Sequence, residues 1–165
     1  MQEPLRIVID SREQAPLAWD PSDATTEIRG LSAGDYALDF DCEEVKGRES
    51  LAVRFAIERK SADDMAGTLG SGWERFLREM ERMETFCARI IVVESDYESF
   101  CFRGGAGAIV PPDHNHHMMT PSFITRRLSQ LFFMNIGVWF AGNSQLSARV
   151  VLHLFRERKR IVDGL

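Results

Sequence analysis

A run of alternating apolar and charged residues starts at Val53 and ends in the stretch Ile57-Glu58-Arg59-Lys60-Ser61-Ala62-Asp63-Asp64, or IERKSADD. The alternation predicts a β-strand, because successive side chains of a strand point to opposite faces of the sheet. Glu58 and Lys60 then leave the strand on the same face. A carboxylate beside a lysine at a strand end suits metal-assisted phosphate chemistry, since the carboxylate can hold a hard cation while the ammonium orients water or balances charge.

Two other acidic segments precede this stretch. Asp10-Ser11-Arg12-Glu13 follows an apolar run at residues 5–9, and Gly34-Asp35-Tyr36 comes later in the chain. With IERKSADD, these segments resemble the nuclease domain of the XPF family (ERCC-type) of structure-specific DNA endonucleases. The marks of that family are D-x-R-E after the first strand, then G-D-Y, then E-R-K-x-x-x-D, and all three occur here in that order. The resemblance spans most of the chain.

The order of the expected elements indicates an α/β fold with a mixed sheet flanked by helices. The first strands are expected as an antiparallel meander with acids at the strand ends, at residues 5–9, 25–29, 36–40 and 51–60. Helices and strands then alternate, with helices from 61, at 73–87, 97–102 and 121–134, and from 144, and strands at 89–94 and 136–141. The resemblance implies that this mixed β-sheet has the restriction-endonuclease-like fold.

The length of 165 residues suits a single domain with a genuine core. We expect residues 1–165 to be one XPF-type nuclease domain without the helix-hairpin-helix module of the large eukaryotic members. In this respect the chain is similar to the compact stand-alone version found in bacteria and phages.

Composition excludes several classes of protein. No apolar run approaches the roughly 20 residues that cross a bilayer, and the amino terminus lacks a signal pattern, so we expect no membrane partner. The three cysteines, an odd number, do not indicate a disulfide framework or a zinc knuckle, and they favour a cytoplasmic location. The net charge of −5 argues against general coating of nucleic acid, although basic residues can gather locally.

The resemblance implies a metal site at the ends of two adjacent strands. Asp35 and Glu58 would hold Mg²⁺ or Mn²⁺, with the backbone carbonyl of Arg59 as a further ligand, and Lys60 would orient or activate the attacking water. The alternative for Asp35 is a Gly-Asp turn without a catalytic role.

Asp10 and Glu13 follow the first strand, where the resemblance implies additional acidic residues at the site. They could bind a second cation or position Lys60 and Arg59. The alternative for Asp10 is a turn residue at a strand end.

By strand alternation, the guanidinium of Arg59 points to the face of Val53, Phe55 and Ile57, away from the metal. A charge buried there needs a partner, and Asp64 and Glu94 are the candidates. Arg59 would then brace the junction of strand and helix, and a phosphate contact is the alternative.

Asp64 has two expected roles that do not exclude each other. Ser61 followed three residues later by an acid is similar to a capping box, so Asp64 could cap the helix that starts there. The E-R-K-x-x-x-D resemblance instead implies a direct role in catalysis.

Two further features are weaker. Arg75, Arg78 and Arg82 share one face of the helix at 73–87, and we favour a solvated face with pairs such as Glu74–Arg78 and Arg75–Glu79 over a phosphate-binding stripe. His114-Asn115-His116 and the glycines at 104–107 are interpreted as parts of a surface loop at 103–120 rather than as a metal or phosphate site.

The function expected from these observations is that of a metal-dependent DNA endonuclease acting on branched, flap or fork DNA in repair or recombination. The alternatives are a catalytically inert DNA-binding or partner module and a phage nuclease that acts on another nucleic-acid structure. A separate DNA-binding partner could supply the absent module.

A homodimer through the carboxy-terminal helix is also expected. Its apolar residues cover far more of the circumference than the roughly 100° that a surface helix buries. They are Leu146, Ala148, Val150, Val151, Leu152, Leu154, Phe155, Ile161 and Val162. The alternative is that the helix at 121–134 covers the excess within one chain.

Overall fold

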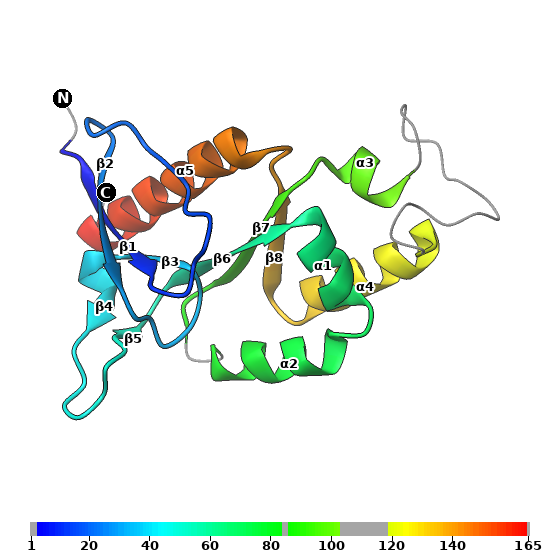
Figure 1. Ribbon diagram of the computed structural model, residues 1–165, viewed down its shortest axis with the longest axis horizontal. Coiled ribbons are helices and arrows are strands. Elements are labelled where there is room, and N and C mark those ends of the chain that lie inside the picture. The colour runs from blue at the N-terminus through cyan, green and yellow to red at the C-terminus, as the bar shows by residue number, and fades with distance from the viewer. Residues whose placement is uncertain (1–2, 84–85, 103–118, 165) are drawn as a thin grey trace.

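A six-stranded mixed sheet forms the centre of the computed structural model, which describes residues 3–83, 86–102 and 119–164 (Figure 1). The strand order is β2-β1-β3-β6-β7-β8. The strands are β1 (Leu5–Asp10), β2 (Ala24–Arg29), β3 (Tyr36–Leu38), β6 (Ala56–Ser61), β7 (Arg89–Glu94) and β8 (Ile136–Phe140). A projecting arm contains β4 (Cys42–Glu43) and β5 (Ala52–Val53), which pair with each other after a short 3-10 turn, η1 (Asp39–Asp41).

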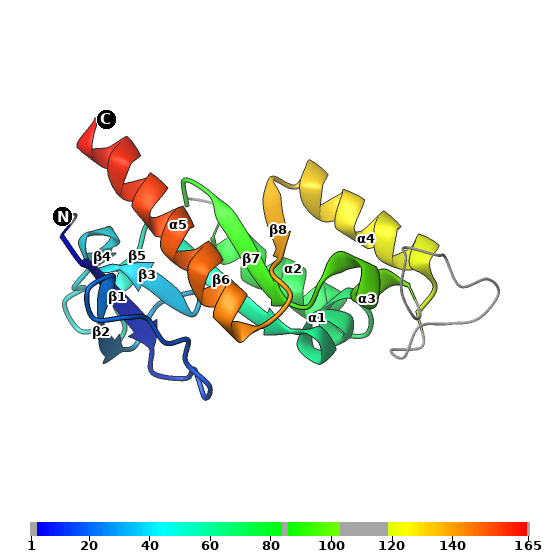
Figure 2. The same ribbon diagram turned by 90° about the horizontal axis from the view of Figure 1, so that it is seen from above.

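Helices cover both faces of the sheet, as Figure 2 shows. The long α5 (Ser144–Asp163) crosses one face. The other face packs against α1 (Ala62–Leu69), α2 (Trp73–Arg82), α3 (Tyr97–Cys101) and α4 (Pro121–Phe133). The expected α/β fold, a mixed sheet flanked by helices, is therefore confirmed. None of the helices in the described residues is both long and apolar enough to cross a membrane.

Each central strand contributes side chains to two hydrophobic cores, as strand alternation requires. In β7, Ile91 and Val93 pack towards α1–α4, while Val92 packs towards α5, and all three are fully buried. Phe55 and Phe155 join the strands to α5 through an edge-to-face contact with ring centroids 6.0 Å apart.

The expected antiparallel meander is wrong at its first step. β1 and β2 pair in parallel, and β3 pairs with β1 and β6 instead of following β2. Parallel pairing needs a crossover, and residues 11–23 provide one of sufficient length. This crossover is held in place because the Leu17 amide donates to the Tyr36 hydroxyl at 3.0 Å and the Trp19 indole donates to the Ala148 carbonyl at 2.7 Å.

Two expected boundaries also differ. The strand expected at 51–60 breaks into β5 and β6, so Val53 packs towards α1–α4 whereas Phe55 and Ile57 pack towards α5. The helix expected to reach residue 87 ends at Arg82, because the chain must return to begin β7, and the Cys87 amide already donates to the carbonyl of Arg54. The loop expected at 103–120, with its histidines and glycines, lies outside the described residues except for 119–120.

Candidate active site

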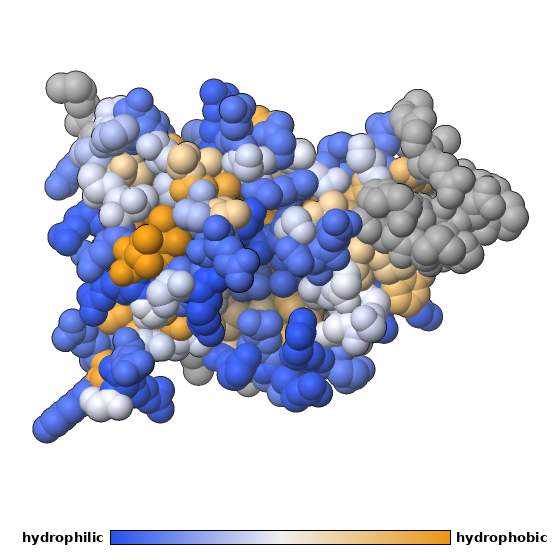
Figure 3. Space-filling model, in the orientation of Figure 1, coloured by the Kyte–Doolittle hydropathy of each residue, from blue (hydrophilic) through white to orange (hydrophobic). Residues whose placement is uncertain are grey.

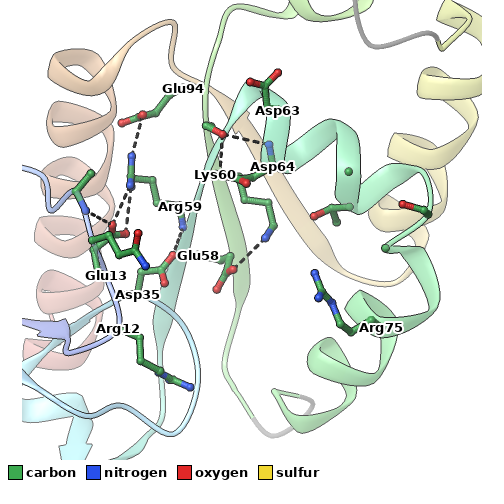
Figure 4. A pocket seen from close by; sticks show the side chains of 17 residues that line it. Arg12, Glu13, Asp35, Glu58, Arg59, Lys60, Asp63, Asp64, Arg75 and Glu94 are labelled. Atoms are coloured by element: carbon green, nitrogen blue, oxygen red, sulfur yellow. Dashed lines mark hydrogen bonds and ion pairs between the residues drawn. The ribbon is translucent and has the colours of Figure 1, made fainter.

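A cavity of about 910 Å³ opens between the loop after β1, the end of β6, and helices α1 and α2 (Figure 4). Six of the seven residues expected at the site line this cavity, and only Asp10 does not. The six are Glu13, Asp35, Glu58, Arg59, Lys60 and Asp64. Three motifs that are separate in sequence therefore meet at one place on the surface.

A glycine positions the first carboxylate. Gly34 has a φ of +77°, which L side chains rarely adopt, and a Cβ there would lie 2.5 Å from the Cβ of Ala56. Only glycine allows this close approach of β3 to β6. Backbone hydrogen bonds then hold Asp35 between two strands, since its amide donates to the Ile57 carbonyl at 3.0 Å and its carbonyl accepts from the Asp10 amide at 2.8 Å.

Asp35 and Glu58 form a pair of poorly solvated carboxylates. Burial, reinforced by the negative charge of Glu58, raises the pKa of Asp35 to about 7, although the Arg59 amide donates to Asp35 Oδ2 at 2.7 Å. Burial also raises the pKa of Glu58. Its Oε1 accepts from Lys60 Nζ at 3.1 Å, as expected for two residues on the same face of a strand. A bound cation would relieve the repulsion between these carboxylates.

The chemistry of these donors fits a hard cation. Within the described residues, no three His, Cys, Asp or Glu side chains are grouped so as to hold a metal ion, which argues against a closed zinc centre there. Mg²⁺ usually needs only one or two carboxylates, because water and substrate phosphates complete its octahedron. Asp35, Glu58 and the Arg59 carbonyl match that requirement.

Arg59 lies on the opposite face of β6, as its position in the strand predicts. Its guanidinium forms ion pairs with Glu94 at 2.8 Å and with Glu13 at 2.9 Å. Of the two expected partners of Arg59, Glu94 forms an ion pair with it and Asp64 does not. Glu13 is a partner that was not expected. Although burial opposes ionisation, the hydrogen bonds from Arg59 lower the pKa of Glu13. The side chain of Arg59 therefore anchors the backbone whose amide holds Asp35.

Asp10 lies beneath the cavity wall and is only 2% exposed. Its Oδ1 accepts from the amide and Nε of Arg12 at 2.9 and 2.6 Å, and its Oδ2 accepts from Arg12 Nη2 at 3.1 Å and the Leu31 amide at 2.6 Å. With both oxygens occupied and no access to the cavity, Asp10 is poorly placed for the expected role as a metal ligand. Its geometry favours a structural role, which is to hold Arg12.

Asp64 lies on the rim of the cavity and is exposed. Its amide donates to Ser61 Oγ at 3.1 Å, and its Oδ2 accepts from the same hydroxyl at 2.7 Å. The expected cap of α1 is therefore present. Because Asp64 also faces the cavity, the cap does not exclude a second role.

Two arginines that line the cavity were missing from the expected site. Arg12 belongs to the D-x-R-E segment, so that motif could have identified it. Arg75 is expected on a solvated face of α2, but it lines the cavity, whereas Arg78 and Arg82 do not. No local pattern distinguishes these three arginines.

Comparison with known proteins gives a consistent result. The family model described as "ERCC4 domain" matches residues 9–154. The solved structure of XPF from Aeropyrum pernix has a TM-score of 0.62 to this chain at 20% identity, over 96% of this chain and 67% of that chain. The same protein in complex with DNA has a TM-score of 0.61 at 21% identity, over 94% and 66%. The search of the curated proteins found no match.

Proposed function

This chain belongs to the ERCC4 domain family, and on that basis we propose that it is a metal-dependent endonuclease that hydrolyses phosphodiester bonds in branched, flap or fork DNA. The observation that supports this most directly is the pair of partly buried carboxylates, Asp35 and Glu58, beside Lys60 in an open cavity. DNA as the substrate is supported by the similar fold of an XPF protein solved in complex with DNA.

The proposed metal ligands are Asp35, Glu58 and the backbone carbonyl of Arg59. A bound Mg²⁺ or Mn²⁺ would stabilise the negative charge that develops on the phosphate and lower the pKa of a coordinated water. Lys60 would orient the attacking water. Its ammonium is held at the cavity by Glu58 and by the ring of Phe76, whose centroid lies 5.8 Å away.

Glu13, Glu94 and Arg59 act behind this site rather than on the substrate. The two glutamates hold the guanidinium, and the Arg59 amide holds one oxygen of Asp35. Preorganisation of this kind keeps the carboxylates in place although they repel each other.

A cleavage assay with labelled flaps, forks, Holliday junctions and linear duplexes tests the proposal. We expect cleavage of branched DNA with Mg²⁺ and none with EDTA. Asp35→Ala and Glu58→Ala should each lower the rate by about a hundredfold or more, because each removes a ligand that stabilises the transition state. Glu74→Ala is the matched control, since Glu74 is exposed and does not line the cavity.

Melting temperatures close to that of the wild type would show that these variants remain folded. Cleavage within about tenfold of the wild type in both carboxylate variants would overturn the metal assignment. A wild-type protein that binds DNA without cutting it would be an inert module of this family. Cleavage of linear duplexes alone, or of another nucleic acid, would overturn the preference for branched DNA.

A further inference from the structure

Arg75 lies on the first turn of α2, on the wall of the cavity opposite the strands. Its side chain is exposed, and Figure 4 shows its guanidinium directed into the cavity towards the side where Glu58 and Lys60 lie. Hydrophilic residues gather over α2 on this face of the molecule (Figure 3). This side of the cavity is therefore a polar surface that solvent and a polar ligand can reach.

Arg75 differs from the other basic side chains that line the cavity. Arg12 pairs with Asp10, Arg59 with Glu13 and Glu94, and Lys60 with Glu58. Arg75 has no ion pair or hydrogen bond with any residue of the part of the chain that the structure describes. The pair Arg75–Glu79, expected from helical spacing, does not form, so the guanidinium of Arg75 is exposed to solvent and available to a ligand.

The charge of the chain favours such a group at a site that binds nucleic acid. The whole chain has a net charge of −5, so its overall field repels a polyanion. The cavity itself is lined by six carboxylates, those of Glu13, Asp35, Glu58, Asp63, Asp64 and Glu94, and by four basic side chains. Of these basic side chains, Arg59 is already paired with Glu13 and Glu94, and Lys60 with Glu58. A bound cation would offset part of the carboxylate charge, but it would attract only the phosphate that it contacts. A neighbouring phosphate needs a basic side chain that is not already paired.

We propose that Arg75 binds the phosphate next to the one that is cleaved, and so holds the DNA strand across the cavity. The guanidinium suits this role because its planar fork can donate two hydrogen bonds to one phosphate. The identity of the ligand rests on the proposed function, but the role of Arg75 concerns binding and needs no metal. Arg75 is therefore a substrate-binding residue on the wall opposite the expected metal ligands.

The test is the binding of a labelled flap DNA, measured by fluorescence anisotropy in EDTA between about 50 and 200 mM salt. We expect Arg75→Ala to weaken binding about tenfold and to reduce the slope of log affinity against log salt by about one, as the loss of one phosphate contact predicts. Arg75→Lys should recover part of the affinity because it restores the charge without the fork.

Arg78→Ala is the matched control, because Arg78 is an exposed arginine of the same helix that does not line the cavity. It should bind within about twofold of the wild type with an unchanged slope. Equal losses for the two variants would overturn the proposal, since they would indicate general attraction rather than a contact. Unchanged binding by Arg75→Ala, or a wild-type protein that does not bind the DNA, would also overturn it.

Cleavage with Mg²⁺ is measured in parallel to separate the two proposals. If the wild type fails to cut but Arg75→Ala alone loses affinity, the endonuclease proposal fails and the role of Arg75 stands. If the wild type cuts the DNA and the two arginine variants bind it with equal affinity, the endonuclease proposal stands and the role of Arg75 fails. Arg75→Gln, which keeps most of the side chain, replaces Arg75→Ala should the latter lower the melting temperature.

Discussion

Arg59 lies between two carboxylates that, like its own side chain, are largely shielded from solvent. The side chains of Arg59, Glu13 and Glu94 are 13%, 8% and 16% exposed. A buried charge is tolerated only while its partner remains, because removal of one partner leaves the other desolvated and unpaired. The stability of the strand–helix junction therefore depends on this one guanidinium.

We predict that Arg59→Ala lowers the free energy of unfolding by about 3–5 kcal/mol and also lowers cleavage. Glu58→Ala should change stability much less, because the loss of its pairing with Lys60 is offset by the loss of repulsion with Asp35. Urea denaturation measures both values. An Arg59→Ala protein with wild-type stability and no cleavage would instead place Arg59 on the substrate.

Asp10 makes a pH-dependent contribution to stability. Burial would raise its pKa, but the hydrogen bonds from Arg12 and Leu31 prevail and lower it below the ordinary value of 3.8. A group whose pKa is lower in the folded state contributes stability above its unfolded pKa, and this contribution is lost as the pH falls through the folded pKa.

Asp10→Asn should therefore lower the free energy of unfolding at pH 7 by about 2 kcal/mol, because it weakens hydrogen bonds to a charged group. The difference from the wild type should shrink as the pH falls below 3.8. Denaturation curves at several pH values provide the measurement. A difference that stays constant down to the lowest pH would contradict a charged Asp10 in the folded protein.

At the scale of elements, the start of α1 combines helix capping with the rim of the cavity. Ser61 accepts from the amide of Asp64 and donates to its carboxylate. The cap requires both residues, whereas a catalytic role would require Asp64 alone, so substitutions of Ser61 and Asp64 can distinguish the two roles.

Ser61→Ala should lower stability by about 1 kcal/mol, the usual loss for a cap, with little change in cleavage. Asp64→Asn keeps an oxygen that can accept from Ser61, so its stability should stay close to that of the wild type. If Asp64 acts in catalysis, cleavage by Asp64→Asn should fall by at least about tenfold. Wild-type cleavage by Asp64→Asn would restrict Asp64 to its role in the cap.

For the whole molecule, the apolar surface of α5 divides into two parts. Ala148, Val151, Leu152 and Phe155 are buried against the sheet. Leu146, Ile161 and Val162 remain 44%, 64% and 51% exposed. The alternative expectation, that the helix at 121–134 covers them, is wrong, because α4 packs in the opposite layer and lies apart from α5 in Figures 1 and 2. We therefore propose that a second copy of the chain covers this surface.

Sedimentation equilibrium at micromolar concentration should detect a species of twice 18.8 kDa. Ile161→Glu and Val162→Glu should split it without unfolding, since both side chains are exposed and a charge opposes apolar burial. Phe155→Glu cannot serve as the test, because Phe155 is fully buried and its replacement would unfold the protein. Gln145→Glu adds the same charge to an exposed site of α5 and should leave the dimer intact. A single species of 18.8 kDa for the wild type would exclude the dimer.

Sequence patterns predict correctly those features of the chain that depend on near neighbours. Strand alternation placed Glu58 and Lys60 on one face of β6 and Arg59 on the other, and the serine three residues before Asp64 identified the cap of α1. The strand expected at 89–94 is present as β7, and its central residues are buried. These signals are reliable because strand alternation and capping act within a few residues.

Which distant segments meet depends on how the whole chain packs. Nothing near β2 in the sequence indicates that it pairs in parallel with β1, since that depends on how residues 11–23 pack. Likewise, the sequence alone suggests Asp10 as a metal ligand, whereas in the folded chain its carboxylate oxygens accept hydrogen bonds from Arg12 and Leu31. In the sequence Arg75 cannot be told apart from Arg78, but in the folded chain only Arg75 of these two lines the cavity. Strand pairing, burial and charge balance arise from contacts between residues far apart in the chain, so local patterns could not determine them.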